Sequence, residues 1–268
     1  CALFAAISGS SAATVATVGK MSIPELRKRN YPEKILLGSL AGSGTLGLLI
    51  PPSIILIIYG VAVQESIAKL FIAGIIPGIM IALIFMTYVV IWSIVNKENM
   101  PKITEEYSLV EKLKRSKQLL PVILLILAVI GSIYTGIATA TEAASLGVVG
   151  ALILSYFQKS LNLDTFRSSL LGATKTSCMI AFILAGSTFL SLAMGFTGLP
   201  KNLAIWIQSM DLSPYVLIFV LMIFYIILGM FLDGISAVVL TMAIIEPMIR
   251  QAGFDMIWFG IFLVVVVE

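Results

Sequence analysis

Two short polar segments interrupt otherwise apolar sequence, and each could supply oxygen ligands for a small cation. The first is Ser8-Gly9-Ser10-Ser11, between the apolar runs Phe4–Ile7 and Ala12–Val18. Hydroxyl groups and freed backbone carbonyls are hard oxygen ligands that suit Na⁺, and hydroxyls can also donate to a carboxylate. Small residues equally permit close helix packing in membranes, so both interpretations stay open.

The second polar segment surrounds Asp233, the only acidic residue between Leu212 and Ile245. A charge at the centre of a bilayer costs about 2.5–3.5 kcal/mol, so such a residue normally faces a cavity and has a partner. Alternatively, Asp233 caps a helix through backbone N–H groups, and both roles can hold together. The candidate binding residues here are Gly229, Asp233, Gly234 and Thr241.

A stretch rich in glycine and proline, Ala41–Ser53, lies inside a long apolar window. Proline lacks a backbone donor and glycine lets the chain turn, so we expect a helix broken in its middle. The half-helix ends would present their dipole and unpaired carbonyls to a bound ion, whereas a simple kink is the alternative. The candidate binding residues here are Gly42, Gly44, Thr45, Pro51 and Pro52.

A weaker candidate site is the segment Thr139-Ala-Thr141-Glu142, where one apolar run ends and a shorter one begins. Glu142 either supports a cation site or stabilises a helix N-terminus through the helix dipole. We favour the helix-stabilising role.

The composition places all these segments in a lipid bilayer. Of the 268 residues, 59% are apolar and 12% are charged, whereas soluble domains carry roughly 25% charged residues. The absence of histidine excludes Ser-His-Asp triads and HExxH zinc sites, so we expect no enzyme and no cofactor besides Na⁺ as coupling ion. A net charge of +3 is too small to indicate nucleic-acid binding. We expect an all-α, polytopic membrane protein.

Charge-free windows predict which segments cross the membrane, since a span needs about 20 apolar residues. Shorter apolar segments indicate re-entrant helical hairpins or broken helices, which persist where protein or a water-filled cavity satisfies their backbone. The long windows are Ile35–Gln64, Leu70–Asn96, Gln118–Thr141, Thr176–Pro200 and Leu212–Leu232. The short ones are Cys1–Gly19, Ala143–Gln158, Gly234–Ile245 and Met256–Val267.

The distribution of lysine and arginine predicts the orientation. Basic residues gather in Lys20–Lys34, Lys97–Lys117 and Lys159–Lys175, whereas Glu65–Lys69 and Gly198–Pro214 hold one each. By the positive-inside rule the first three loops are cytoplasmic and the other two lie outside.

The spacing of a few residues predicts an internal repeat. Ser10, Pro24 and Tyr31 have the same spacing as Asp233, Pro247 and Phe254, 223 residues later. The second return segment, Glu246–Asp255, is predicted outside and the first inside, so the repeat is of inverted topology. Chance alignment is the alternative. The offset aligns Glu268 with Thr45, so we expect a fragment whose parent protein continues into a second Pro-Pro motif.

Four motifs together resemble the large membrane subunit of TRAP (tripartite ATP-independent periplasmic) transporters, the DctM-like permease. They are FAAISGSSAAT (Phe4–Thr14), GTLGLLIPPS (Gly44–Ser53), TEAA (Thr141–Ala144) and GMFLDG (Gly229–Gly234). The resemblance implies a Na⁺-driven importer of the bacterial inner membrane with an elevator-type fold. It also implies two partners, a small membrane subunit and a periplasmic substrate-binding protein. The latter delivers an organic acid such as a C4-dicarboxylate or a sialic acid.

The resemblance assigns Ser8–Ser11 and Gly42–Thr45 to a first sodium-binding half, and Asp233 with its neighbours to a second. Family subunits extend further at both ends, so we do not expect this chain to transport alone. A related divalent-anion/sodium symporter that needs no binding protein is the alternative, although GTLGLLIPPS fits it less well. An ion channel would need a pore-lining charge ring or a filter repeat, and the sequence shows neither.

We expect four consecutive segments along the chain. Residues 1–64 hold the second arm of the first hairpin, a cytoplasmic loop and the broken helix. Residues 65–117 hold a transmembrane helix and an interfacial amphipathic helix at Glu105–Gln118. Residues 118–175 hold scaffold helices, and residues 176–268 hold the second half with the second hairpin.

Overall fold

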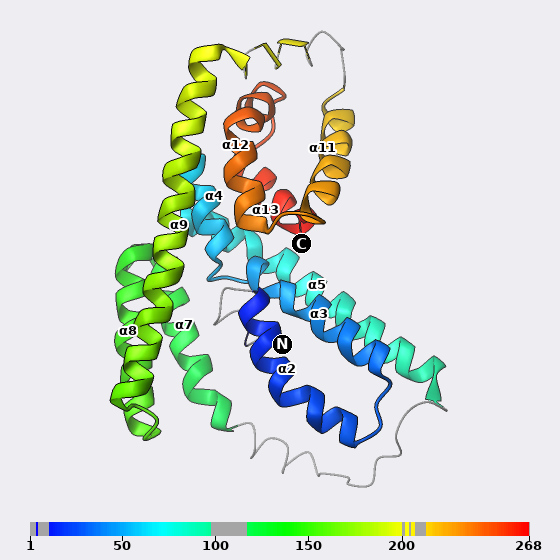
Figure 1. Cartoon of the computed structure of the whole chain (residues 1–268), viewed down its shortest axis with the longest axis vertical. Coiled ribbons are helices and arrows are strands. Elements are labelled where there is room, and N and C mark those ends of the chain that lie inside the picture. Colours follow the sequence, from blue (N-terminus) through cyan, green and yellow to red (C-terminus); the bar gives the residue numbers. More distant parts are fainter. Residues whose placement is uncertain are drawn as a thin grey trace. The chain divides into compact units, whose positions relative to one another are not determined.

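The computed structural model describes residues 4, 11–97, 117–199, 202–203, 205–206 and 213–267. These residues form helices and no strand (Figure 1). Four helices are long and apolar enough to cross a membrane, and a broken pair would make a fifth. The prediction of an all-α polytopic membrane protein is therefore confirmed for this part of the chain. The longer helices are α2 (Ser11–Lys28), α3 (Glu33–Leu49), α4 (Ile54–Ala62), α5 (Ile67–Val95), α7 (Leu120–Tyr134), α8 (Ala140–Phe157), α9 (Leu163–Thr197), α11 (Pro214–Gly229), α12 (Gly234–Gln251) and α13 (Met256–Val267).

The chain folds into two compact units that alternate along the sequence. One comprises Cys1–Pro52 and Ile75–Leu161, and the other Ser53–Gly74 and Asn162–Glu268. In the first unit α2 packs on α3 and α7 packs on α8. In the second unit α12 is central and packs against α4, α9, α11 and α13 (Figure 1).

The predicted repeat is visible in the helix boundaries. Helices α2 and α12 both have 18 residues, and each begins and ends 223 residues from its counterpart. Helices α3 and α13 begin at the same offset, at Glu33 and Met256. Pro24 and Pro247 lie inside α2 and α12 at equivalent positions. The spacing of the repeat is thus confirmed, while its inverted orientation remains a prediction.

The turn that joins the two helices of each copy has the same backbone hydrogen bonds. Asn30 and Gly253 are both left-handed, with φ of 57° and 81°, a conformation that glycine and asparagine tolerate best. Their N–H groups donate to the carbonyls of Arg27 and Arg250, at 2.9 and 3.2 Å. The following N–H groups, of Tyr31 and Phe254, donate to Leu26 and Ile249 at 3.1 and 3.2 Å. Both turns are therefore Schellman motifs.

Helices extend further into the predicted loops than expected. Helix α12 continues through Pro247 to Gln251, so most of the predicted return segment Glu246–Asp255 is helical. Helix α9 begins at Leu163, inside the predicted loop Lys159–Lys175, because the Asn162 side chain accepts the N–H of Thr165 at 2.7 Å. Charged residues mark the membrane boundary, whereas the capping residue marks where the helix starts.

Two segments predicted to be too short for a crossing form 18-residue helices, α8 and α12, which are long enough to cross a membrane. Conversely, the predicted span Gln118–Thr141 contains the shorter α7, which ends at Tyr134. A turn with Gly136 at φ 72° follows it. Most of the predicted amphipathic helix, residues 105–116, lies outside the described residues.

The break expected in Ala41–Ser53 falls at its prolines and not at its glycines. Helix α3 runs without interruption through Gly42, Gly44 and Thr45 to Leu49, and α4 starts at Ile54. The Pro51-Pro52 peptide bond is cis. Proline removes a backbone donor, whereas glycine keeps it, so the prolines end the helix and the glycines do not.

Candidate functional site

The first predicted site is partly described. Ser8, Gly9 and Ser10 lie outside the described residues, and Ser11 is the first residue of α2. A Cβ atom placed on Gly44 would lie 3.6 Å from the backbone oxygen of Ser11 and 2.2 Å from Cγ2 of Val15. The structure therefore brings Ser11 and Gly44 together, and Gly44 allows this close approach because it has no side chain.

The neighbouring candidates on α3 also lie at close helix contacts. A Cβ atom on Gly42 would lie 2.8 Å from the ring of Phe85 in α5. The Thr45 hydroxyl donates to the carbonyl of Gly42 at 2.9 Å, and this bond leaves its oxygen lone pairs able to accept or to coordinate. The glycines thus serve packing, and Thr45 retains an oxygen suited to a cation.

After the prolines, Ser53 is fully buried and caps α4, accepting the N–H of Leu56 at 3.4 Å. Of the two predicted site prolines, Pro51 is buried and Pro52 is half-buried. The N-terminal end of α4 carries the positive end of the helix dipole. This end is therefore suited to face an anion.

In the second predicted site, Asp233 caps α12. Its Oδ2 accepts the N–H of Ser236 at 3.3 Å, and its Oδ1 accepts the Ser236 hydroxyl at 2.5 Å. Gly234 is the first residue of the helix, and the Asp233 side chain is exposed. The capping role predicted for Asp233 is confirmed, while its electrostatic role near a cation remains a prediction.

The other two candidates of this segment hold α11 in place. A Cβ atom on Gly229, the last residue of α11, would lie 2.5 Å from the carbonyl oxygen of Val267 in α13. The Thr241 hydroxyl donates to the Ala237 carbonyl at 2.7 Å and lies 2.7 Å from the hydroxyl of Tyr225 in α11. Because the single Thr241 proton is used, Tyr225 is the donor in this second bond.

The weaker candidates form a capping box at the start of α8. The Thr139 hydroxyl accepts the N–H of Glu142 at 3.3 Å, and a Glu142 carboxylate oxygen accepts the N–H of Thr139 at 2.8 Å. Both side chains are exposed, and the Thr141 carbonyl accepts the Ser145 hydroxyl at 3.3 Å. The favoured helix-stabilising role of Glu142 is confirmed.

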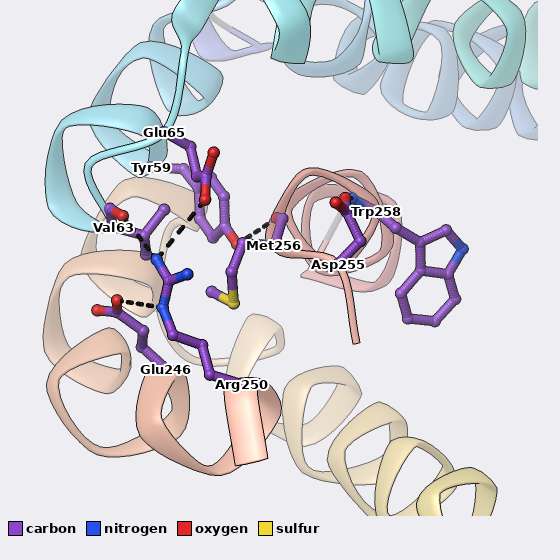
Figure 2. Close-up of polar contacts among 8 residues, drawn as sticks. All are labelled: Tyr59, Val63, Glu65, Glu246, Arg250, Asp255, Met256 and Trp258. Atoms are coloured by element: carbon purple, nitrogen blue, oxygen red, sulfur yellow. Dashed lines mark hydrogen bonds and ion pairs between the residues drawn. The ribbon is translucent and has the colours of Figure 1, made fainter. Parts of the chain in front are cut away.

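Three polar contacts between helices were not predicted from the sequence. The Tyr59 hydroxyl donates to the carbonyl of Met256 at 2.6 Å (Figure 2), and the Ser187 hydroxyl donates to that of Val239 at 2.6 Å. Arg250, expected at loop depth, lies in the last turn of α12 and contacts Val63. A tyrosine inside an apolar window was the available signal, since a buried hydroxyl usually finds a partner.

Comparisons with known proteins agree along the whole chain. The family described as "Tripartite ATP-independent periplasmic transporter, DctM component" matches residues 1–268. The C4-dicarboxylate TRAP transporter large permease protein DctM of Pseudomonas aeruginosa is 35% identical over 100% of this chain and 62% of its own length. Its namesake from Rhodobacter capsulatus is 34% identical over 100% and 64%. The 2,3-diketo-L-gulonate TRAP transporter large permease protein YiaN of Escherichia coli is 30% identical over 98% and 61%. The chain spans less than two thirds of the length of these relatives.

Proposed function

Because this chain belongs to the DctM family of tripartite ATP-independent periplasmic transporters, we propose that it forms the translocating part of a permease that imports an organic acid together with Na⁺. Its apolar helices make it a multi-pass membrane protein. We place it in the bacterial inner membrane, where a periplasmic binding protein and a small membrane subunit assist it.

The observation that carries the proposal is the repeated unit of α2–α3 and α12–α13, with its matching helix lengths and turns. Secondary transporters use such repeats to place ion and substrate sites at the ends of broken helices. Movement of one repeat-containing body relative to the rest of the protein, as in an elevator, would then expose these sites to each side in turn.

We propose that one Na⁺ site uses hydroxyl and carbonyl oxygens of Ser8–Ser11, Gly42 and Thr45. Two features support this site: the Ser11 carbonyl lies beside Gly44, and Thr45 keeps free lone pairs on its oxygen. A second site would use oxygens around Asp233, whose carboxylate supplies negative charge near the cation.

The names of the relatives guide the choice of substrate. Two relatives are named for C4-dicarboxylates and one for 2,3-diketo-L-gulonate, all of them carboxylates. We therefore propose a C4-dicarboxylate as the first substrate to test and a sialic acid as the second. The positive end of the α4 dipole, capped by Ser53, is suited to face the carboxylate.

The test is uptake of a radiolabelled C4-dicarboxylate by the full-length permease and its small subunit in proteoliposomes. We expect uptake only when both an inward Na⁺ gradient and the loaded binding protein are present. Equal uptake without the binding protein would favour the related divalent-anion symporter. A saturation-free current independent of Na⁺ would indicate a channel instead.

A further inference from the structure

The C-terminal end of α4 is held by a side chain from another helix. The last carbonyls of any α-helix lack partners within that helix. The carbonyl of Val63, the residue that follows α4, accepts a hydrogen bond from Nη2 of Arg250 at 3.1 Å (Figure 2). Arg250 belongs to the last turn of α12, so this bond joins the ends of two helices.

The same guanidinium group also holds two carboxylates. Its Nε donates to Oε1 of Glu246 at 2.9 Å, and its Nη2 lies 3.6 Å from Oε1 of Glu65 (Figure 2). The two acidic side chains are only 28% and 27% exposed, which limits the screening of these pairs by solvent. Arg250 therefore joins its own helix to both the last carbonyl and the following residues of α4.

A second contact fixes α4 sideways. The hydroxyl of Tyr59, in the middle of α4, donates to the Met256 carbonyl, and its ring lies so close to Gly260 that an added Cβ would be 2.5 Å away. This contact orients α4 against α13, whereas the Arg250 contact fixes its position along its own axis.

We propose that Arg250 is a positioning residue that sets the axial position of α4 and thereby the location of its N-terminal end at Ser53. Helix α4 with its caps is about 15 Å long and stiff, so a shift at Val63 displaces Ser53 by a similar amount. This inference rests on the proposed function, in which the N-terminal end of α4 belongs to the ion and substrate site.

The fork of the guanidinium group suits this role better than an ammonium group would. Arginine offers five donors in a fixed plane, whereas lysine is a point charge on a flexible stem. Arg27, at the equivalent position of the first repeat, pairs with Glu33 across its own turn. Arg27 is thus a matched control: it has the same place in the repeat and the same Schellman turn.

The test compares Arg250→Lys with Arg27→Lys in the full-length permease, reconstituted with its small subunit and binding protein. For Arg250→Lys we expect the Na⁺ concentration at half-maximal uptake to rise about five-fold, as for one lost charge-assisted hydrogen bond at a partly exposed site. The maximal rate and the melting temperature should stay close to the wild-type values. Glu65→Gln should raise the Na⁺ requirement as well, and the double variant should add little to Arg250→Lys.

Amide hydrogen exchange of the purified permease gives a second measurement that is independent of transport. Arg250→Lys should accelerate exchange at residues 61–65 about five-fold and Arg27→Lys should not. Unchanged exchange there would overturn the proposal, as would a drop in melting temperature and yield at an unchanged Na⁺ requirement. Absence of Na⁺-dependent uptake by the wild-type permease would instead refute the proposed function, and the exchange data would still decide the role of Arg250.

Discussion

The hydroxyl of Tyr59 donates to the carbonyl oxygen of Met256 at 2.6 Å, although the two residues lie 197 positions apart. Tyr59 is fully buried and Met256 is 3% exposed, so no solvent competes for this bond. Met256 is the first residue of α13, the second helix of the later repeat. The bond therefore connects α4 to the point where that repeat turns.

Tyr59→Phe should lower the free energy of unfolding by about 1–3 kcal/mol, because it leaves the buried Met256 carbonyl without its donor. Tyr215→Phe is the matched control, since Tyr215 is 81% exposed. Thermal unfolding of the purified permease would measure both effects. Equal melting temperatures for the two variants would show that the Tyr59 bond does not stabilise the fold.

Gly44→Ala should destabilise the α2–α3 pair by about 1–3 kcal/mol, because the new Cβ would overlap Val15 and force it to shift. Gly38→Ala in the same helix meets nothing within 4 Å, so it should be neutral or stabilise by up to about 1 kcal/mol. Adding Val15→Ala to Gly44→Ala should restore part of the loss. A failure of this rescue in thermal unfolding would show that contact with Val15 is not the cause.

Asp233→Asn should weaken sodium coupling while the protein still inserts and keeps its fold. Asparagine retains an oxygen that can accept the Ser236 N–H group, so the cap survives and only the negative charge is lost. Asp255→Asn is the matched control, because Asp255 caps α13 by accepting the Trp258 N–H at 2.9 Å. The measurement is the Na⁺ dependence of uptake.

Normal sodium dependence in Asp233→Asn would reduce Asp233 to a cap. In that case Asp233→Ala, which removes the acceptor as well, should still impair transport. An equal effect of Asp255→Asn would indicate a general loss of helix stability.

Single cysteines at Lys28 and Gln251, which are equivalent positions at the ends of α2 and α12, should react from opposite sides of the membrane. Both native side chains are exposed, so a membrane-impermeant maleimide should reach them. We expect Lys28→Cys to label only from the cytoplasm and Gln251→Cys only from the periplasm. Labelling of both from one side would overturn the inverted orientation and leave the repeat parallel.

The sequence identified features whose cause is local. Proline cannot donate a backbone hydrogen bond, so Pro51-Pro52 predicted the helix break, and a capping acid or threonine predicted the helix starts at Asp233 and Thr139. The spacing of Pro24 and Pro247 predicted the repeat because equal helix lengths place equal residues at equal distances.

Features that depend on distant residues were not predictable in this way. Whether Gly44 breaks a helix or packs against one depends on Val15, which lies 29 positions away and contacts it only in the fold. Similarly, the position of Arg250 next to positive-inside loops said nothing about Val63, whose carbonyl it binds. Both errors arise because a residue type fixes its backbone preference but not its tertiary neighbour.

The two Schellman turns have one consequence for how the repeated unit can diverge. Their geometry comes from main-chain hydrogen bonds and one left-handed residue, so most side chains around them can change without altering the shape. At the residue that precedes the first helix of each copy, one copy carries the neutral Ser10 and the other the acidic Asp233. Two copies of one backbone unit therefore differ by a full negative charge, and a monovalent cation would be neutralised in only one of them.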